Sequence, residues 1–355
     1  MQLKTKPNFE EAADRWEAFW RGEVLDRPPV CIVAPKDGAE PAASPGQLFA
    51  WSQGPRRAAE QCRAHAATHA FLGEAIPFIR PGFGPDTYAA LMGAQLRSSP
   101  ESSQTNWAVP CVEDWDAFAP STLDDANSTW RDLLEFARVA AEVGEGVFLV
   151  GQADLHGNLD ALSALRGPEN LCLDLLERPE AVARALEEAL SRFPAIYGGL
   201  WDAGKMAERG SIGWIPAYAR GRFCTLQCDF LCMVGPAMAR RFVFPALERE
   251  AACVDHAVFH YDGPGALGHL DDVCALPGLE VIQWVPGAGD RPRHVDWLDL
   301  LKDIQSRGKG LHLSGRPEEV KTLRRELRPE KVFFDVQGVR SQREGEELLK
   351  WFARS

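Results

Sequence analysis

Eight short apolar runs recur along the chain, and stretches with a helical pattern separate most of them. Short runs that are apolar throughout are typical of buried strands, whereas the stretches between them repeat their apolar residues with the period of a helix. Alternating strands and helices predict a mostly parallel sheet of the α/β class, and eight strands predict closure into a (β/α)8 TIM barrel. The expected strands are 30–33, 75–79, 147–150, 224–230, 257–261, 279–285, 310–313 and 332–336. The expected helices are 55–72, 130–143, 168–203, 236–256, 295–307, 317–327 and 341–352.

Two regions fall outside this alternation. Residues 9–21 have helical spacing, with Trp16 and Trp20 on one apolar stripe, and predict an N-terminal helical extension. Residues 82–129 are rich in Pro, Ser, Asp and Trp and are long for a plain loop, so we expect an elaborated loop region over the barrel mouth. Because no low-complexity tract or short repeat divides the chain, residues 1–355 are expected to form one domain.

The charge balance narrows the range of partners. Acidic residues outnumber basic ones by 51 to 39, which gives a formal net charge of −12. We therefore expect no general binding to nucleic acid or to an anionic membrane, because both depend on clustered Lys and Arg. With no apolar run near the roughly 20 residues that span a bilayer and no signal-peptide core, a cytoplasmic protein is expected. Nine cysteines without a CxxC pair are expected to be mostly reduced and buried.

The most informative polar motif follows the expected strand 257–261. His260 and Asp262 lie two residues apart on an extended segment, which places both side chains on one face. An imidazole and a carboxylate so placed can share a metal ion or act as an acid–base pair. The Gly263-Pro264-Gly265 turn would let a ligand approach the backbone closely. The alternative is a buried His–Asp hydrogen bond that only holds the loop.

Further polar residues cluster after other strands, where the active face of a barrel lies. Asp229 follows Gln227 and Cys228, and could act in catalysis or cap the helix that begins near 236. Asp154 and His156 lie in a polar, glycine-containing turn, and could bind substrate or cap the next helix. The remaining candidates are His269, which either faces the mouth or is solvated, and His312, which is expected to be a core histidine.

Three tryptophans are expected near the mouth because they lie in loops or at a strand end beside Pro or Gly. Trp107, Trp214 and Trp284 could enclose a cationic or apolar ligand, although most of the 11 tryptophans must be core residues. The Walker P-loop, GxGxxG, HExxH and GxSxG signatures are all missing from the sequence. Nucleotide and serine-hydrolase chemistry is therefore not indicated.

Several short motifs recur in order along nearly the whole chain. They are Asp26-Arg27-Pro28-Pro29-Val30, Leu165-Arg166-Gly167-Pro168-Glu169, Pro179-Glu180, Gln227-Cys228-Asp229-Phe230, Phe244-Pro245, His260-Tyr261-Asp262-Gly263 and Ile282-Gln283-Trp284-Val285-Pro286-Gly287. Taken together, these motifs resemble the uroporphyrinogen decarboxylase superfamily, and within it the cobalamin-dependent methyltransferase-like branch. The resemblance implies a (β/α)8 barrel. The haem-pathway decarboxylase itself is not expected, because the arginines that hold its substrate's carboxylates are missing from residues 32–38.

The same resemblance implies a zinc site built from a His-x-Cys pair and a second Cys near the last strand. Here His260 matches the histidine, Asp262 stands in place of the first Cys, and Gln337, or less well Asp335, stands in place of the second. Such a site would favour oxygen-rich coordination of zinc or another divalent metal, or no metal at all. No DxHxxG corrinoid module is present in the chain, so a partner protein would have to supply the corrinoid.

The leading hypothesis is methyl transfer between a small-molecule donor and a corrinoid or corrinoid protein. The chain could form a homodimer. One alternative is a metal-assisted or acid–base lyase or hydrolase acting on a small polar or sugar-like substrate. Another is a barrel that binds a small molecule without catalysis. The expected catalytic residues are Asp229, His260 and Asp262, the expected metal ligands His260, Asp262 and Gln337, and the expected substrate contacts Asp154, His156, Trp107, Trp214, Gln227, His269 and Trp284.

Overall fold

A mostly parallel sheet forms the centre of the computed structural model, which describes residues 2–46, 52–98 and 105–354. Its neighbouring strands are all parallel except for one antiparallel pair at the edge, β2 with β1. The seven strands are hydrogen-bonded in the order β2 (His69–Gly73), β1 (Val30–Pro35), β13 (Val332–Val336), β12 (Gly310–Gly315), β11 (Val281–Val285), β10 (His256–Asp262) and β9 (Phe223–Gln227).

Short strands outside this sheet form separate two-stranded pairs. β3 (Phe78–Ile79) and β6 (Leu149–Val150) pair in parallel, and β7 (Ser211–Ile212) pairs antiparallel with β8 (Tyr218–Ala219). Gln152 N donates to Ile212 O at 2.8 Å, which joins the end of β6 to β7. All eight expected strands are present, and the α/β class is confirmed. Hydrogen bonding among the described strands does not close them into one barrel, because β3, β6 and β7 are each only two residues long.

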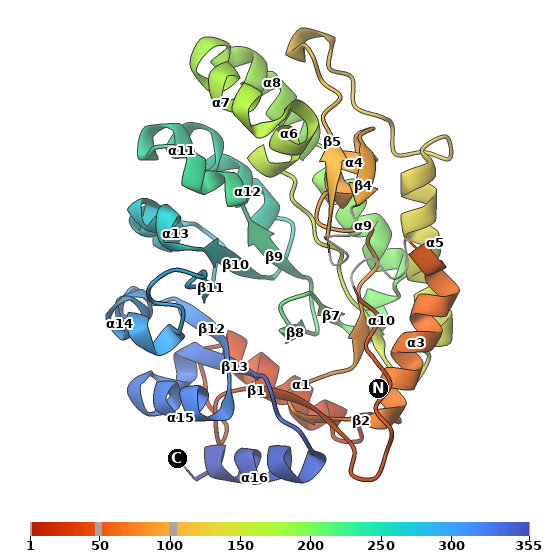
Figure 1. Cartoon of the computed structure of the whole chain (residues 1–355), viewed down its shortest axis with the longest axis vertical. Helices are drawn as coiled ribbons and strands as arrows, with labels where there is room; N and C mark the ends of the chain where they lie inside the picture. Colours follow the sequence, from red (N-terminus) through yellow and green to blue (C-terminus); the bar gives the residue numbers. More distant parts are fainter. Residues whose placement is uncertain (1, 47–51, 99–104, 355) are drawn as a thin grey trace.

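Helices surround the strands on the outside, as expected for alternating β and α segments (Figure 1). Many of them begin with a proline, which suits the first turn because its missing N–H has no partner there. The outer helices are α3 (Pro55–Thr68), α5 (Ser128–Val143), α6 (Leu159–Arg166), α7 (Pro168–Glu177), α8 (Pro179–Leu190), α9 (Phe193–Ala203), α10 (Met206–Arg209), α11 (Pro236–Phe242), α12 (Phe244–Ala251), α13 (Leu270–Ala275), α14 (Leu298–Ser306), α15 (Pro317–Glu326) and α16 (Gln342–Phe352).

Several expected boundaries were wrong for identifiable reasons. The expected helix 55–72 ends at Thr68, and the residues after it form β2, because they pair with the free edge of β1. The expected helices 168–203 and 236–256 are interrupted where prolines begin new helices, as at Pro179. The expected strand 224–230 ends at Gln227, and a 3-10 turn, η3 (Asp229–Met233), follows it.

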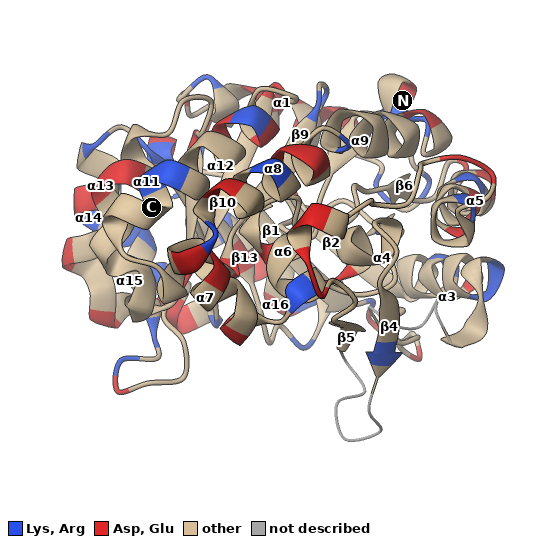
Figure 2. Ribbon diagram, turned by 90° about the horizontal axis from the view of Figure 1, so that it is seen from above, with Lys and Arg blue, Asp and Glu red and all other residues tan. Residues whose placement is uncertain are grey.

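The segment 82–129 is partly ordered into secondary structure. It contains α4 (Thr87–Leu91) and the antiparallel pair of β4 (Gln95–Ser98) with β5 (Asn106–Val109). This hairpin projects from the body of the fold in the view of Figure 2. The same figure shows that acidic and basic residues both occur on the outer helices. Within the described residues, no helix has the length and apolar character needed to cross a membrane.

The N-terminal helix α1 (Phe9–Trp20) packs against the sheet through aromatic rings, as its apolar stripe predicts. Trp16 is fully buried and meets Phe333 of β13 edge-to-face at 5.0 Å. A buried carboxylate, Glu74, then ties this region to the first strand. Its Oε1 accepts from Arg15 at 2.7 Å and from Arg27 at 2.9 Å, and its Oε2 accepts from the backbone of Val30 at 2.7 Å.

Replacing Glu74 by Gln should strongly destabilise the fold, because it leaves the buried guanidinium of Arg27 without a counter-charge. Removing one partner of a buried ion pair typically costs roughly 3–5 kcal/mol. Urea unfolding of E74Q measures the loss. A matched control is E347Q, which removes the carboxylate of the exposed pair with Arg343 and should change stability by less than about 1 kcal/mol. Equal stabilities of the two variants would contradict the assignment.

Candidate active site

The strand register places a row of polar side chains across the sheet. His260 on β10 pairs in register with Gln227 on β9 and with Gln283 on β11, and Gln283 pairs with His312 on β12. Residues in register on parallel strands share a face, so these side chains lie on one side of the sheet. The next residue of β10, Tyr261, lies on the opposite face and is buried.

His260 is oriented by a partner on the next strand. Its Nδ1 lies 2.5 Å from Oε1 of Gln283, and because the amide oxygen accepts, Nδ1 carries a hydrogen. In the neutral imidazole the lone pair is then on Nε2. The ring of Trp214 meets His260 edge-to-face at 5.0 Å. A histidine whose second nitrogen donates to a fixed acceptor is typical of metal-binding sites.

Two carboxylates complete a group around this histidine. Asp229, His260 and Asp262 each offer a ligand atom, and these atoms all lie within 4.8 Å of one another. Both aspartates are exposed, whereas His260 is half-buried. One imidazole and two carboxylates fit a divalent cation with coordination positions open to substrate, and carboxylates favour harder ions than thiolates do.

The third member of this group is Asp229, whereas the sequence pointed to Gln337. Gln337 is exposed just after the end of β13, and β11 and β12 separate β13 from β10 in the sheet. Asp229 comes from the end of β9, the strand next to His260. Proximity between neighbouring strands therefore favours Asp229 over Gln337 as the third ligand.

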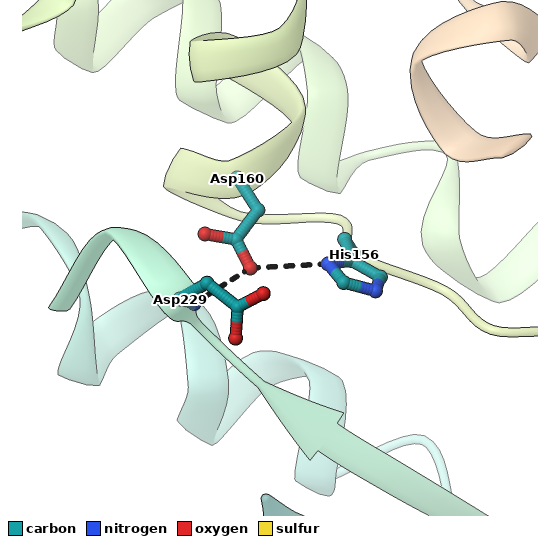
Figure 3. A group of neighbouring side chains, drawn as sticks. All are labelled: His156, Asp160 and Asp229. Atoms are coloured by element: carbon teal, nitrogen blue, oxygen red, sulfur yellow. Dashed lines mark hydrogen bonds and ion pairs between the residues drawn. The ribbon is translucent and has the colours of Figure 1, made fainter. Parts of the chain in front are cut away.

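A second group, shown in Figure 3, shares Asp229 but is already saturated with hydrogen bonds. Nδ1 of His156 donates to Oδ2 of Asp160 at 3.1 Å. The same carboxylate accepts the backbone N–H groups of Asp229 at 2.9 Å and Phe230 at 2.8 Å. Asp160 thus caps the turn η3 and fixes where Asp229 lies. Asp229 does not cap α11, because the N-cap of that helix is Gly235 and no side chain caps it.

In this second group, the neighbouring charges of His156, Asp160 and Asp229 shift one another's pKa values. Burial by itself would lower the pKa of His156, but the carboxylates of Asp154 and Asp160 outweigh it and raise this pKa to about 10. Burial would raise the pKa of Asp160, but hydrogen bonds from His156 and the backbone lower it. Burial and the charge of Asp160 raise the pKa of Asp229. His156 is therefore an imidazolium at neutral pH, and a cation there has no lone pair for a metal.

The loop that carries His156 is held by buried polar groups. Asn158 Nδ2 donates to the backbone oxygen of Gln227 at 2.8 Å and lies 3.3 Å from Glu250 Oε2. A Cβ at Gly157 would lie only 2.8 Å from Glu250 Oε1, so only glycine fits there. Sequence reasoning missed Glu250 because its partners come from a loop about 90 residues away, which a local pattern does not reveal.

A cavity of about 410 Å³ opens beside these groups and contains Asp154 and Trp214 in its wall. Asp154 also accepts from Gln227 Nε2 at 2.6 Å and from His156 Nε2 at 3.2 Å, so it links the cavity to the saturated group. Arg80, directly after β3, was missed by sequence reasoning, although the rule that strand ends form the active face applies to it. The lining also includes Cys31, Cys62, His65, Phe71, Ile76, Pro77, Phe78, Phe136, Pro216 and Asp335.

The other expected substrate contacts lie outside the cavity wall. Trp284 is 0% exposed and packs between Tyr261 and Trp297 on the helix side of the sheet. His269 is buried, with Nε2 bonded to the backbone oxygen of Val234 at 3.0 Å. Trp107 is 44% exposed on the β5 hairpin. These three positions offer no direct contact with a molecule in the cavity.

His312 is buried as expected of a core histidine and stacks on Phe333 at 4.5 Å. Burial lowers its pKa to about 3, so it is neutral at physiological pH. Its two ring nitrogens have no hydrogen-bond partner among the described residues. In this respect it differs from His260, whose Nδ1 is paired.

Comparison with known proteins supports the fold. No protein-family model matches the sequence, and no curated protein matches it. Among solved structures, a methyltransferase from Methanosarcina mazei matches with a TM-score of 0.63 at 13% sequence identity. The match covers 97% of this chain and 98% of that one. A likeness at this identity shows that the two chains share a fold over nearly their whole lengths.

The pH dependence of stability should report the buried carboxyl of Glu250. Burial raises its pKa to about 8, so between pH 4.5 and 8 the native protein keeps a proton that the unfolded chain has lost. Stability from this proton is full below pH 4.5 and falls with rising pH, by up to about 1.4 kcal/mol per pH unit, until pH 8. Urea unfolding of E250Q across this range should show a shallower decline than the parent protein. E347Q is the surface control, and parallel curves for E250Q and the parent would contradict the assignment.

Proposed function

We propose that the protein is a methyl-transfer enzyme of the uroporphyrinogen decarboxylase-like superfamily, with a divalent metal held by Asp229, His260 and Asp262. The observation that carries the proposal is the orientation of His260, whose Nε2 lone pair is left free by Gln283 beside two carboxylates. The methyltransferase from Methanosarcina mazei, which shares the fold over nearly its whole length, supports the reaction class.

In this proposal the cavity binds the methyl donor and the metal group lies beside it. Bound there, a divalent cation would supply Lewis acidity to polarise the donor or the group that leaves it. Trp214 lines the cavity and touches His260, so a ligand against its ring lies close to the proposed metal. The corrinoid that accepts the methyl group would arrive on a partner protein.

Release of the demethylated donor needs a proton on the atom that keeps the bonding electron pair. Asp335 lines the cavity, and burial raises its pKa to about 6, which suits a group that gives and takes a proton near neutral pH. His156 is held as an imidazolium by two carboxylates and serves to orient Asp154 at the cavity wall.

A second candidate is acid–base lyase or hydrolase chemistry on a small polar substrate. Burial raises the pKa of Asp335 to about 6, which favours this candidate because a carboxyl group that exchanges a proton near neutral pH suits proton transfer without a metal. Burial and the charge of Asp160 also raise the pKa of Asp229. The two candidates differ in whether His260 is required for binding a metal.

Metal analysis of protein purified without chelator tests the proposed site. We expect about one divalent cation per chain, and its loss in H260A, because the imidazole is the only nitrogen ligand of the group. Q283A should weaken metal affinity by about 10- to 100-fold, since the second-sphere acceptor orients the ring. H256A is a matched control because His256 bonds Glu280 outside the group. Metal that persists in H260A, or none in the parent protein, would favour acid–base chemistry.

A further inference from the structure

Arg80 brings an uncompensated positive charge to the cavity. It follows β3, lines the cavity and is largely buried, and this burial lowers its pKa. Within the described ranges its guanidinium has no hydrogen bond and no carboxylate within 4.0 Å. Asp154, whose charge acts on Arg80, is engaged by Gln227 and His156. A buried charge without a partner is costly, so the site is built for an anion.

Asp335 brings an uncompensated acidic group to the same cavity. It lies two residues beyond Phe333 on β13, so it shares the face that carries Phe333. Its carboxyl group lines the cavity, and in the part of the chain that the structure describes it makes no hydrogen bond or ion pair. Arg80 and Asp335 therefore do not neutralise each other directly, although both face one small space.

Trp214 adds an aromatic wall and a hydrogen-bond donor. Its indole Nε1 is buried without a partner among the described residues, and its ring lies between the cavity and His260. The electron-rich face of an indole attracts organic cations, which are also attracted by a carboxylate. Asp335 and Trp214 together suit an ammonium group, just as Arg80 suits a carboxylate.

From these three residues we infer that the cavity binds a small zwitterion, with its carboxylate at Arg80 and its ammonium group at Asp335 and Trp214. The volume of about 410 Å³ is near the lower end for ligand sites and suits a molecule of amino-acid size. A dianion would leave Asp335 facing like charge, and a simple cation would leave Arg80 unpaired. That the zwitterion is also the methyl donor rests on the function proposed above, whereas its binding does not.

Calorimetric titration at low ionic strength tests the inference without requiring turnover. The zwitterionic probes are glycine, sarcosine and glycine betaine, and the single-charge probes are acetate and tetramethylammonium. We expect at least one zwitterion to bind more than tenfold tighter than either single-charge probe. R80Q should weaken zwitterion binding by tenfold or more while tetramethylammonium binding persists. D335N should weaken binding of the zwitterions and of tetramethylammonium but spare acetate.

Matched variants keep the outcome interpretable. R97Q removes an exposed arginine of β4 and should leave all affinities unchanged. R80K retains the charge and should recover part of the affinity if R80Q folds poorly. H260A and D262N should keep zwitterion binding even where they abolish metal binding and methyl transfer. Failure of the proposed function can therefore be told apart from failure of the zwitterion inference. The inference is overturned if none of the three zwitterions binds more tightly than the single-charge probes, or if R80Q and D335N leave zwitterion binding unchanged.

Discussion

The register of three parallel strands determines what the candidate site can do. Because β10 lies between β9 and β11, His260 has Gln227 on one side and Gln283 on the other. Gln283 fixes the imidazole and leaves one nitrogen available, while Gln227 holds Asp154 in the cavity wall. A shift of one residue in this register would move His260 to the helix side of the sheet, where Tyr261 lies.

Two groups that look alike in composition differ in how far their hydrogen bonds are satisfied. The carboxylate of Asp160 accepts from His156 and from two backbone N–H groups, so little capacity remains for a ligand. By contrast, Asp262 and the Nε2 atom of His260 have no such bonds among the described residues. The saturated group supplies a fixed position for Asp229, whereas the open group is the one proposed above to hold a metal. Asp229 belongs to both and connects them.

Sequence patterns were sufficient to locate the strands and the region of the candidate site. Each expected strand could be located because it is a local apolar run, and the His260–Asp262 spacing follows from the two-residue period of a strand. The helix ends, the edge strand β2 and the short β7 depend on tertiary pairing, which composition does not reveal. Trp284 has the same surroundings in sequence as Gln283, and only the alternation of faces places it in the core, away from the cavity.

The two carboxylates of the proposed metal site are consistent with the ligand inferred for the cavity. A thiolate-rich site suits activation of a thiol, whereas Asp229 and Asp262 beside His260 suit a harder cation and an oxygen- or nitrogen-containing ligand. The cavity next to it carries Arg80, Asp335 and the ring of Trp214, and none of these groups is specific for sulfur. Since Trp214 contacts His260, a charged ligand fixed at both ends in the cavity would present its ammonium end to the open group. The proposed metal site and the inferred ligand site therefore both favour small charged amines over thiols as substrates.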